Sequence, residues 1–139
     1  MIKFDLSKRV AVITGGAQGF GFAIAERFIQ SGAKVVIWDI DEQETKKAIE
    51  KINSENISYK IVNVCNFEEI SKSLKDIETE HNKIDIFVNN AGITGMNKTV
   101  AEYPIEEPYA VIKKISMCLT FIKNVSNIQV LLKRKKTKP

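Results

Sequence analysis

Short apolar runs alternate with segments of helical period along about the first 90 residues. The runs are rich in β-branched residues and almost continuously apolar, which is typical of strands buried on both faces of a parallel sheet. They lie at Val10 to Ile13, Val35 to Trp38, Ile57 to Val64 and Ile84 to Val88. Amphipathic helices are expected between them, at Phe20 to Ser31, Glu42 to Asn53 and Phe67 to His81. This order predicts an α/β fold, a doubly wound parallel sheet that is incomplete at four strands.

Residues at the predicted helix ends support these boundaries. Gly32 follows the first helix, at the position where many helices end in a left-handed residue. Asn66 precedes the third helix and Glu69 stands three residues later, a pattern that resembles a capping box.

The pattern changes after Val88. The segment from Ala91 to Pro108 contains turn formers and two prolines, and no further strand–helix–strand unit follows it. Apolar side chains in steps of four and three predict a C-terminal helix over residues 109–132. We therefore expect a half-domain at 1–108, that helix, and a basic disordered tail at 133–139. Unless the segment 109–132 folds over it, the outer edge of the fourth strand would expose unpaired backbone groups and favour aggregation.

The composition is that of one globular domain, with 139 residues, 44% hydrophobic and 27% charged. The net charge of the chain is +4, and five positive charges lie in the last seven residues. The rest of the chain is therefore close to neutral, and the basic character belongs to the tail. That tail has no interleaved aromatic residues, and we expect no nucleic-acid partner. No window approaches the roughly 18 apolar residues of a membrane span, and an acid stands near the start, where a signal peptide is apolar. We therefore expect a cytoplasmic chain with no membrane partner.

Cys65 and Cys118 stand apart, with no second pair and no histidine cluster beside them. This spacing fits neither a disulfide framework nor a zinc site, so we predict a reducing compartment and no metal site. For His81, at the end of the third helix, we expect a favourable C-terminal charge or a solvent-facing side chain.

A glycine-rich turn joins the first strand to the first helix. It reads Thr14-Gly15-Gly16-Ala17-Gln18-Gly19-Phe20-Gly21. Glycines let the backbone approach a pyrophosphate closely, and the unpaired amides and positive dipole end of the helix face its charge. Glycines also occur in tight turns that bind nothing, so this motif needs a second signal.

The second signal is Asp39, at the end of the second strand and 24 residues after Gly15. That offset is close to the one at which an acid accepts hydrogen bonds from the adenosine ribose of a dinucleotide. Asp41 and Glu42 show that acids also occur here as solvated loop residues, which is the alternative interpretation.

The carboxylate of Asp39 also favours NAD as the cofactor. A 2′-phosphate about 4 Å from it is repelled by about 1 kcal/mol in water and by about 4 kcal/mol at an effective dielectric constant of about 20. No Arg or Lys lies in the turn or directly after Asp39 to offset this repulsion. NAD should therefore be preferred over NADP by about one to three orders of magnitude in affinity.

Two motifs, with the acid between them, resemble the classical short-chain dehydrogenase/reductase family. The turn has the spacing Thr-Gly-x-x-x-Gly-x-Gly, and Asn89-Asn90-Ala91-Gly92 stands at the end of the fourth strand. The strands beside these motifs resemble the bacterial branch of 3-oxoacyl-[acyl carrier protein] reductase and acetoacetyl-coenzyme A reductase. The resemblance covers about residues 4–112 and implies a Rossmann-like fold.

The resemblance also implies a set of cofactor-binding residues. Those expected along the pyrophosphate and the adenosine ribose are Gly15, Gln18, Gly19, Phe20, Asp39 and Ile40. Those expected around the adenine and on the nicotinamide side are Asn63, Val64, Asn90, Ala91 and Gly92. Asn89 is expected mainly to tie the sheet together. Asn63 replaces the family's usual Asp, so its amide oxygen would accept from the adenine amino group.

In the family, a Tyr-x-x-x-Lys pair and an upstream Ser deliver the proton to the reduced carbonyl. Tyr109 and Lys113 have this spacing, but they follow Gly92 too closely, and no strand ending in Ser precedes them. Ile115 also stands where the family has a helix Asn. We therefore assign no catalytic residue. We expect a reading frame that is truncated or shifted after about residue 112, with no family resemblance from residue 115 onward.

By the resemblance, the family reaction is hydride transfer between a nicotinamide and a small carbonyl or alcohol substrate, here of 3-oxoacyl type. Family members are usually homo-oligomers. Our leading hypothesis is the NAD(H)-binding portion of such an enzyme, inactive as this chain. Two alternatives stay open: a non-catalytic module that binds dinucleotide, and a fragment that needs a partner chain.

Overall fold

The structure, a computed structural model, describes residues 4–92 and 129–132. Its elements in chain order are β1 (Val10–Thr14), α1 (Gly19–Gln30), β2 (Lys34–Asp39), α2 (Glu42–Ile52), β3 (Ile57–Ile61), α3 (Phe67–His81), β4 (Ile86–Asn89) and β5 (Gln129–Leu132). The strands form one parallel sheet in the order β3-β2-β1-β4-β5. The predicted α/β class and the Rossmann-like arrangement are confirmed.

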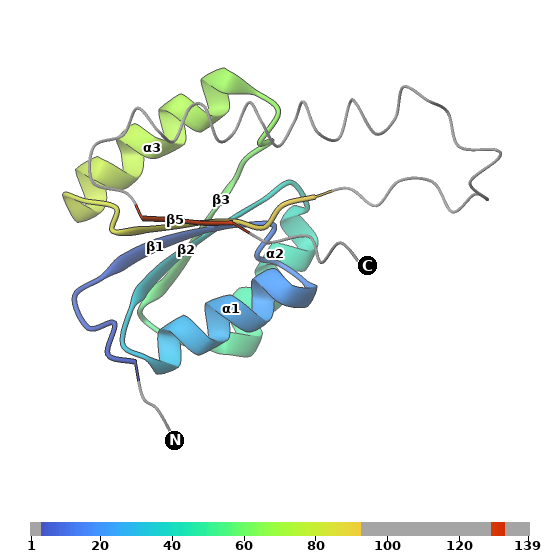
Figure 1. Cartoon of the computed structure of the whole chain (residues 1–139). Coiled ribbons are helices and arrows are strands. Elements are labelled where there is room, and N and C mark those ends of the chain that lie inside the picture. The colour runs from blue at the N-terminus through green and yellow to red at the C-terminus, as the bar shows by residue number, and fades with distance from the viewer. Residues whose placement is uncertain (1–3, 93–128, 133–139) are drawn as a thin grey trace, which may run out of the picture.

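Helices cover both faces of the sheet, with α1 and α2 on one face and α3 on the other (Figure 1). Side chains alternate along a strand, so each central strand supplies both layers of the core. In β1, Val10 and Val12 pack in the cluster that includes α3, whereas Ala11 and Ile13 pack in the cluster that includes α1 and α2. Burial on both faces explains why the strands read as continuous apolar runs.

The predicted helix boundaries are confirmed to within one residue. Gly32 follows α1 with a φ of 90°, in the left-handed region that was expected of it. Asn66 caps α3, because its Oδ1 accepts from the N–H groups of Glu68 and Glu69 at 3.0 and 3.4 Å. The Glu69 carboxylate accepts from Asn66 Nδ2 at 2.9 Å and from the N–H of Asn63 at 2.7 Å. The capping network therefore extends into the loop after β3.

A fifth strand corrects the prediction for residues 129–132, for which apolar spacing favoured a helix. These residues form β5, which pairs with β4 from Ile86↔Gln129 to Asn89↔Leu132. So short an apolar run has no clear period, and an open strand edge offers it hydrogen-bond partners. Because β4 is flanked by β1 and β5, part of the segment 109–132 covers the edge of β4, which is the exception that the sequence-based prediction allowed. The rest of the predicted helix, the boundary at 108 and the tail lie outside the described residues.

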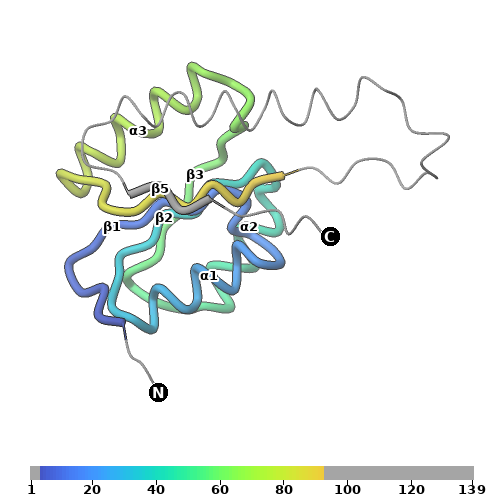
Figure 2. The backbone as a smooth tube through the Cα atoms, in the orientation of Figure 1, coloured from blue at the N-terminus to red at the C-terminus, as the bar shows by residue number. Residues whose placement is uncertain are grey.

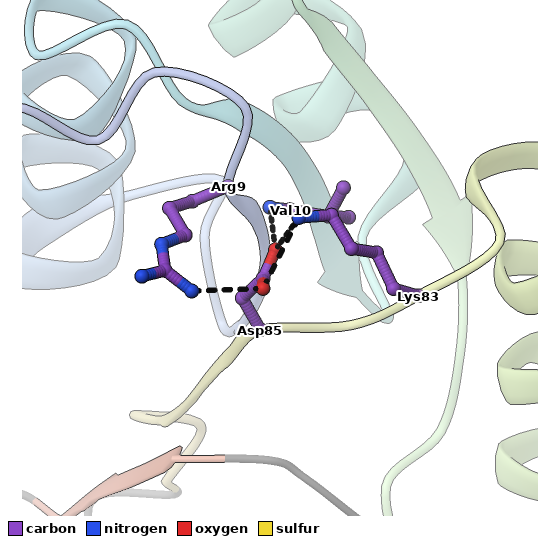
Figure 3. Close-up of polar contacts among 4 residues, drawn as sticks. All are labelled: Arg9, Val10, Lys83 and Asp85. Atoms are coloured by element: carbon purple, nitrogen blue, oxygen red, sulfur yellow. Dashed lines mark hydrogen bonds and ion pairs between the residues drawn. The ribbon is translucent and has the colours of Figure 1, made fainter.

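Asp85 joins the amino ends of β1 and β4 (Figure 3). Its Oδ2 accepts from the N–H of Val10 at 2.8 Å, its Oδ1 accepts from Arg9 Nη1 at 3.2 Å, and Lys83 Nζ lies 2.9 Å from Oδ2. The side chain is only 14% exposed. Burial raises the pKa of this carboxyl, but the hydrogen bonds from Val10, Lys83 and Arg9 outweigh burial and hold the pKa below its ordinary value.

Within residues 4–92 and 129–132, no helix is long and apolar enough to cross a membrane. The same part of the chain contains no group of three or more His, Cys, Asp or Glu side chains that could hold a metal ion. Cys65 is a free and half-buried thiol, and Cys118 lies outside the described residues. The His81 side chain is 19% exposed, so it does not face solvent, and its Nε2 lies 3.9 Å from a carboxylate oxygen of Glu80.

Candidate functional site

The carboxyl ends of β1 and β4 lie at the point where the order of the strands reverses. From β1 the chain winds outward through β2 to β3, and it then returns through α3 on the other face to β4 (Figure 2). Ligands of open α/β sheets bind outside the carboxyl ends of the strands at such a point. Every predicted site residue lies at or just beyond the carboxyl end of β1, β2, β3 or β4.

In the glycine-rich turn between β1 and α1, Gly21 is tightly packed against the turn, whereas Gly19 is exposed. Gly21 packs against the turn itself, where an added Cβ would overlap the carbonyl oxygen of Gly15. Gly19 has a φ of 55° and is exposed, and an added Cβ would meet no described heavy atom within 4 Å. The backbone at Gly19 is therefore free to be approached closely, as a phosphate group requires.

The start of α1 differs from the starts of α2 and α3. Gln18, at its N-cap, makes no side-chain hydrogen bond to the helix, and no acidic residue lies in the first turn. In contrast, Asp41 caps α2 and Asn66 caps α3, and each of these helices has two acidic residues in its first turn. The positive dipole end of α1 is therefore not neutralised by its own first turn, which favours the binding of an anion.

Asp39 ends β2 directly beside this turn. Its Oδ2 accepts from the N–H of Ala17 at 3.1 Å, and its Oδ1 accepts from the N–H of Asp41 at 3.1 Å. The residue is half-buried, and each carboxylate oxygen keeps a lone pair for a further donor. Ile40, the next residue, is 69% exposed. The predicted ribose acceptor and the predicted phosphate turn are therefore in contact.

The first turns of α2 are rich in paired charges. Lys46 Nζ lies 2.7 Å from Glu42, and Lys47 Nζ lies 2.6 Å from Glu44. Hydrogen bonds from Lys47 and then from Gln18 lower the pKa of Glu44. Lys46 and Lys47 in this part of α2 are both paired with carboxylates.

Thr14 and Asn90 join the carboxyl ends of β1 and β4. The fully buried Thr14 hydroxyl accepts from the N–H of Asn90 at 3.0 Å and from the N–H of Ala91 at 2.9 Å. The Asn90 side-chain amide donates to the carbonyls of Thr14 and Gly15 at 3.2 and 3.1 Å. The Asn89 side chain, which we expected to tie the sheet, accepts a long hydrogen bond from the Thr14 hydroxyl through its Oδ1 at 3.5 Å.

Sequence reasoning missed the part that Thr14 plays in this arrangement. The motif contains Thr14, but the signal that identifies its role is a buried hydroxyl at the end of one strand facing the amides that follow another strand. That juxtaposition depends on the pairing of β1 with β4, which are far apart in sequence.

Asn63 and Val64 lie in the loop between β3 and α3, because β3 ends at Ile61 rather than at Val64 as predicted. The Oδ1 of Asn63 accepts from the N–H of Cys65 at 3.0 Å. Val64 packs against the core cluster that includes α3. The loop shares the carboxyl edge of the sheet with the turn and Asp39. Tyr109 and Lys113 lie outside the described residues.

The sequence model of the short chain dehydrogenase family matches residues 9–133. The chain is 36% identical over 92 residues to the 3-oxoacyl-[acyl-carrier-protein] reductase of Chlamydia trachomatis, covering 64% of this chain and 37% of that protein. It is also 36% identical over 112 residues to a probable NADP-dependent mannitol dehydrogenase of Yarrowia lipolytica, covering 78% of this chain and 40% of that protein. The crystal structure of 3-ketoacyl-(acyl-carrier-protein) reductase from Brucella melitensis complexed with NADH matches with a TM-score of 0.75 and 27% identity, covering 86% of this chain and 48% of that one.

The chain spans about a third to a half of the length of these relatives. The family match continues to residue 133, so the expected loss of family resemblance from residue 115 onward is wrong. The match covers most of the chain and agrees with the sheet order and with the turn at the switch point. The chain therefore belongs to the short-chain dehydrogenase family.

Proposed function

We propose that this chain is the NAD(H)-binding portion of a short-chain dehydrogenase/reductase. The observation that carries this proposal is the 3.1 Å contact between Asp39 Oδ2 and the N–H of Ala17. It puts a carboxylate that can accept from ribose hydroxyls directly beside a turn that suits a pyrophosphate. The open start of α1 supports the phosphate half of the assignment, and membership of the family supports a dinucleotide as the ligand.

The residues present fit such a ligand at the carboxyl edge of the sheet. Those that would hold the pyrophosphate and the adenosine ribose are Gly15, Gln18, Gly19, Phe20, Asp39 and Ile40. Those that would lie along the adenine and the nicotinamide side are Asn63, Val64, Asn90, Ala91 and Gly92. The bound cofactor would supply the hydride. The chain's own contribution is to bind the anionic pyrophosphate at α1 and to orient the two nucleotides on either side of it.

NAD(H) is the expected cofactor, in preference to NADP(H). Asp39 would repel a 2′-phosphate, and the lysines of α2 in the turns that follow are paired with Glu42 and Glu44. One relative is named for NADP and one solved relative is complexed with NADH, so both cofactors occur among the relatives of this chain. We expect NADH to bind at least tenfold more tightly than NADPH.

The substrate class we propose is a 3-oxoacyl thioester, as the names of the reductase relatives suggest. This chain has one Tyr-x-x-x-Lys sequence, at Tyr109 and Lys113, to which we assign no catalytic role. We therefore expect the 139-residue chain to bind cofactor without reducing acetoacetyl thioesters. Sustained substrate-dependent oxidation of NADH by the purified chain would contradict this assignment.

Binding can be measured through Trp38, the single tryptophan, which precedes Asp39 in β2. Titration with NADH should give saturable quenching of its emission, with energy transfer to the reduced nicotinamide. Asp39→Ala should weaken NADH binding at least tenfold because the ribose hydroxyls lose their acceptor. Asp76→Ala is a matched control, since it removes the same charge from α3. No saturable change with the unaltered chain would exclude the proposed function.

A further inference from the structure

We propose that Asp39 is also the positioning residue for the glycine-rich turn, in addition to accepting from the ribose of the ligand. Its carboxylate would fix the turn through the Ala17 amide before any dinucleotide arrives. This second role rests on the proposed function in so far as the positioned turn serves a pyrophosphate. The hydrogen bond itself involves only groups of this chain.

The Ala17 amide needs an acceptor from outside the turn. Ala17 is only 7% exposed, and it lies between β1 and α1, where no strand or helix partner accepts from its N–H. A buried backbone N–H without an acceptor is strongly disfavoured. Asp39 Oδ2, 22 residues further along the chain, lies 3.1 Å from this nitrogen and supplies the missing acceptor.

The carboxylate is itself held from its other side. Its Oδ1 accepts from the N–H of Asp41, which in turn caps α2 by accepting from the N–H of Glu44 at 3.0 Å. The carboxylate therefore sits between two backbone donors, one on the turn before α1 and one at the start of α2. Because Asp39 is the last residue of β2, a carboxylate held in this way can fix the position of the turn relative to the end of that strand.

Among the described residues, one other hydrogen bond joins the turn to β2, and it lies where the turn leaves β1. The N–H of Gly15 donates to the carbonyl of Trp38 at 2.7 Å, which continues the sheet ladder by one residue. Asn90 holds the carbonyl of Gly15 from the other side, at 3.1 Å. The Asp39 contact reaches two residues further into the turn than either of these. Its loss should therefore loosen the part of the turn nearest Gln18 and Gly19.

The two roles of Asp39 can be separated by changing the ligand as well as the residue. The probe is the NADH analogue with 2′,3′-dideoxyadenosine, which has no adenosine ribose hydroxyl for the carboxylate to bind. Asp39→Asn and Asp39→Ala both remove the negative charge, but the asparagine keeps one oxygen, which can accept from either the Ala17 or the Asp41 amide, and protection of the Ala17 amide from exchange shows which one it serves. Calorimetric titration of both variants with this probe therefore isolates the contact with the turn.

We expect the Asn variant to bind the dideoxy probe about fivefold more tightly than the Ala variant, the effect of one hydrogen bond. Asp76→Ala should bind it as the unaltered chain does. If Asp39 acts only on the ribose, the Asn and Ala variants will bind the probe equally well, and that result would overturn the proposal.

Amide hydrogen exchange of the ligand-free chain gives a second readout. The Ala17 amide should exchange at least tenfold faster in Asp39→Ala, while the Val36 amide in the middle of β2 keeps its rate. Across the three Asp39 forms, affinity for the dideoxy probe should follow protection of the Ala17 amide. Unchanged Ala17 exchange in the Ala variant would overturn the positioning role. If the unaltered chain fails to bind NADH but Ala17 exchange depends on Asp39, the proposed function fails and the hydrogen bond stands.

Discussion

At the scale of single residues, the hydroxyl of Thr14 joins the two strands that frame the site. Thr14→Val keeps the shape of the side chain but leaves the amides of Asn90 and Ala91 without their acceptor. We expect this variant to lose about 1–3 kcal/mol in the free energy of unfolding. Thr14→Ser keeps the hydroxyl and should lose only about 1 kcal/mol, for one methyl group. Urea denaturation compares the two, and a Val variant as stable as the Ser variant would contradict the role of the hydroxyl.

The sequence predicted the position of Asp39, because local patterns mark the ends of the two strands that place it. Asp39 was expected beside the glycine-rich turn, and the structure puts it there, because the end of β2 and the end of β1 are adjacent in a parallel sheet. The sequence could not predict which of Asn89 and Asn90 makes the main hydrogen bonds between β4 and the end of β1. It depends on which amide faces the Thr14 hydroxyl once β4 has paired with β1.

At the scale of elements, Asn66 fixes both the start of α3 and the loop that precedes it. Asn66→Ala removes the acceptor of two first-turn amides and a donor to Glu69. We expect a loss of about 1 kcal/mol in unfolding free energy, while Asn66→Ser, which keeps a capping oxygen and adds no charge beside Glu69, should stay within about 0.5 kcal/mol of the unaltered chain. Thermal denaturation checks both values, and equal losses in the two variants would show that the cap is not what matters.

The elements that sequence predicted accurately are those with signals at both ends. The range Phe67–His81 is bounded by Asn66 and by Asn82, which has a left-handed φ of 62°. By contrast, β5 has four residues and no such boundary signals. Its identity comes from the ladder of β4, a partner about 40 residues earlier that no local pattern reveals. Local signals therefore predict an element's limits, and distant pairing decides the type of a short one.

The Asp85 contact makes the pairing of β1 with β4 depend on pH. The pKa of Asp85 is lowered in the folded chain, so the ionised carboxylate stabilises the fold above the ordinary carboxyl pKa of about 3.9. That contribution is lost as the pH falls through the lowered folded pKa. Asp85→Asn should therefore be less stable than the unaltered chain at pH 7, with the difference shrinking below about pH 4. Unfolding free energies from pH 3 to pH 7 test this, and Asp76→Asn is the matched control.

At the scale of the whole molecule, a ligand that binds only the folded chain should raise its stability. At a free NADH concentration of 100 times the dissociation constant, we expect a gain of about 2.7 kcal/mol in unfolding free energy. NADPH at the same concentration should give a smaller gain, because Asp39 would repel its 2′-phosphate. Denaturation with each cofactor measures the two gains, and equal gains would contradict the preference for NAD.

The central place of β1 in the sheet bears on the order in which the chain can assemble during synthesis. The neighbour of β1 on one side, β2, follows soon after it, but the neighbour on the other side, β4, is made only after α3. A nascent chain can therefore build β1, β2 and β3 with the turn and Asp39 while the Thr14 hydroxyl still awaits the amide of Asn90, 76 residues later. The nicotinamide side of the site, at Asn90, Ala91 and Gly92, would then be completed last, when β4 docks against β1.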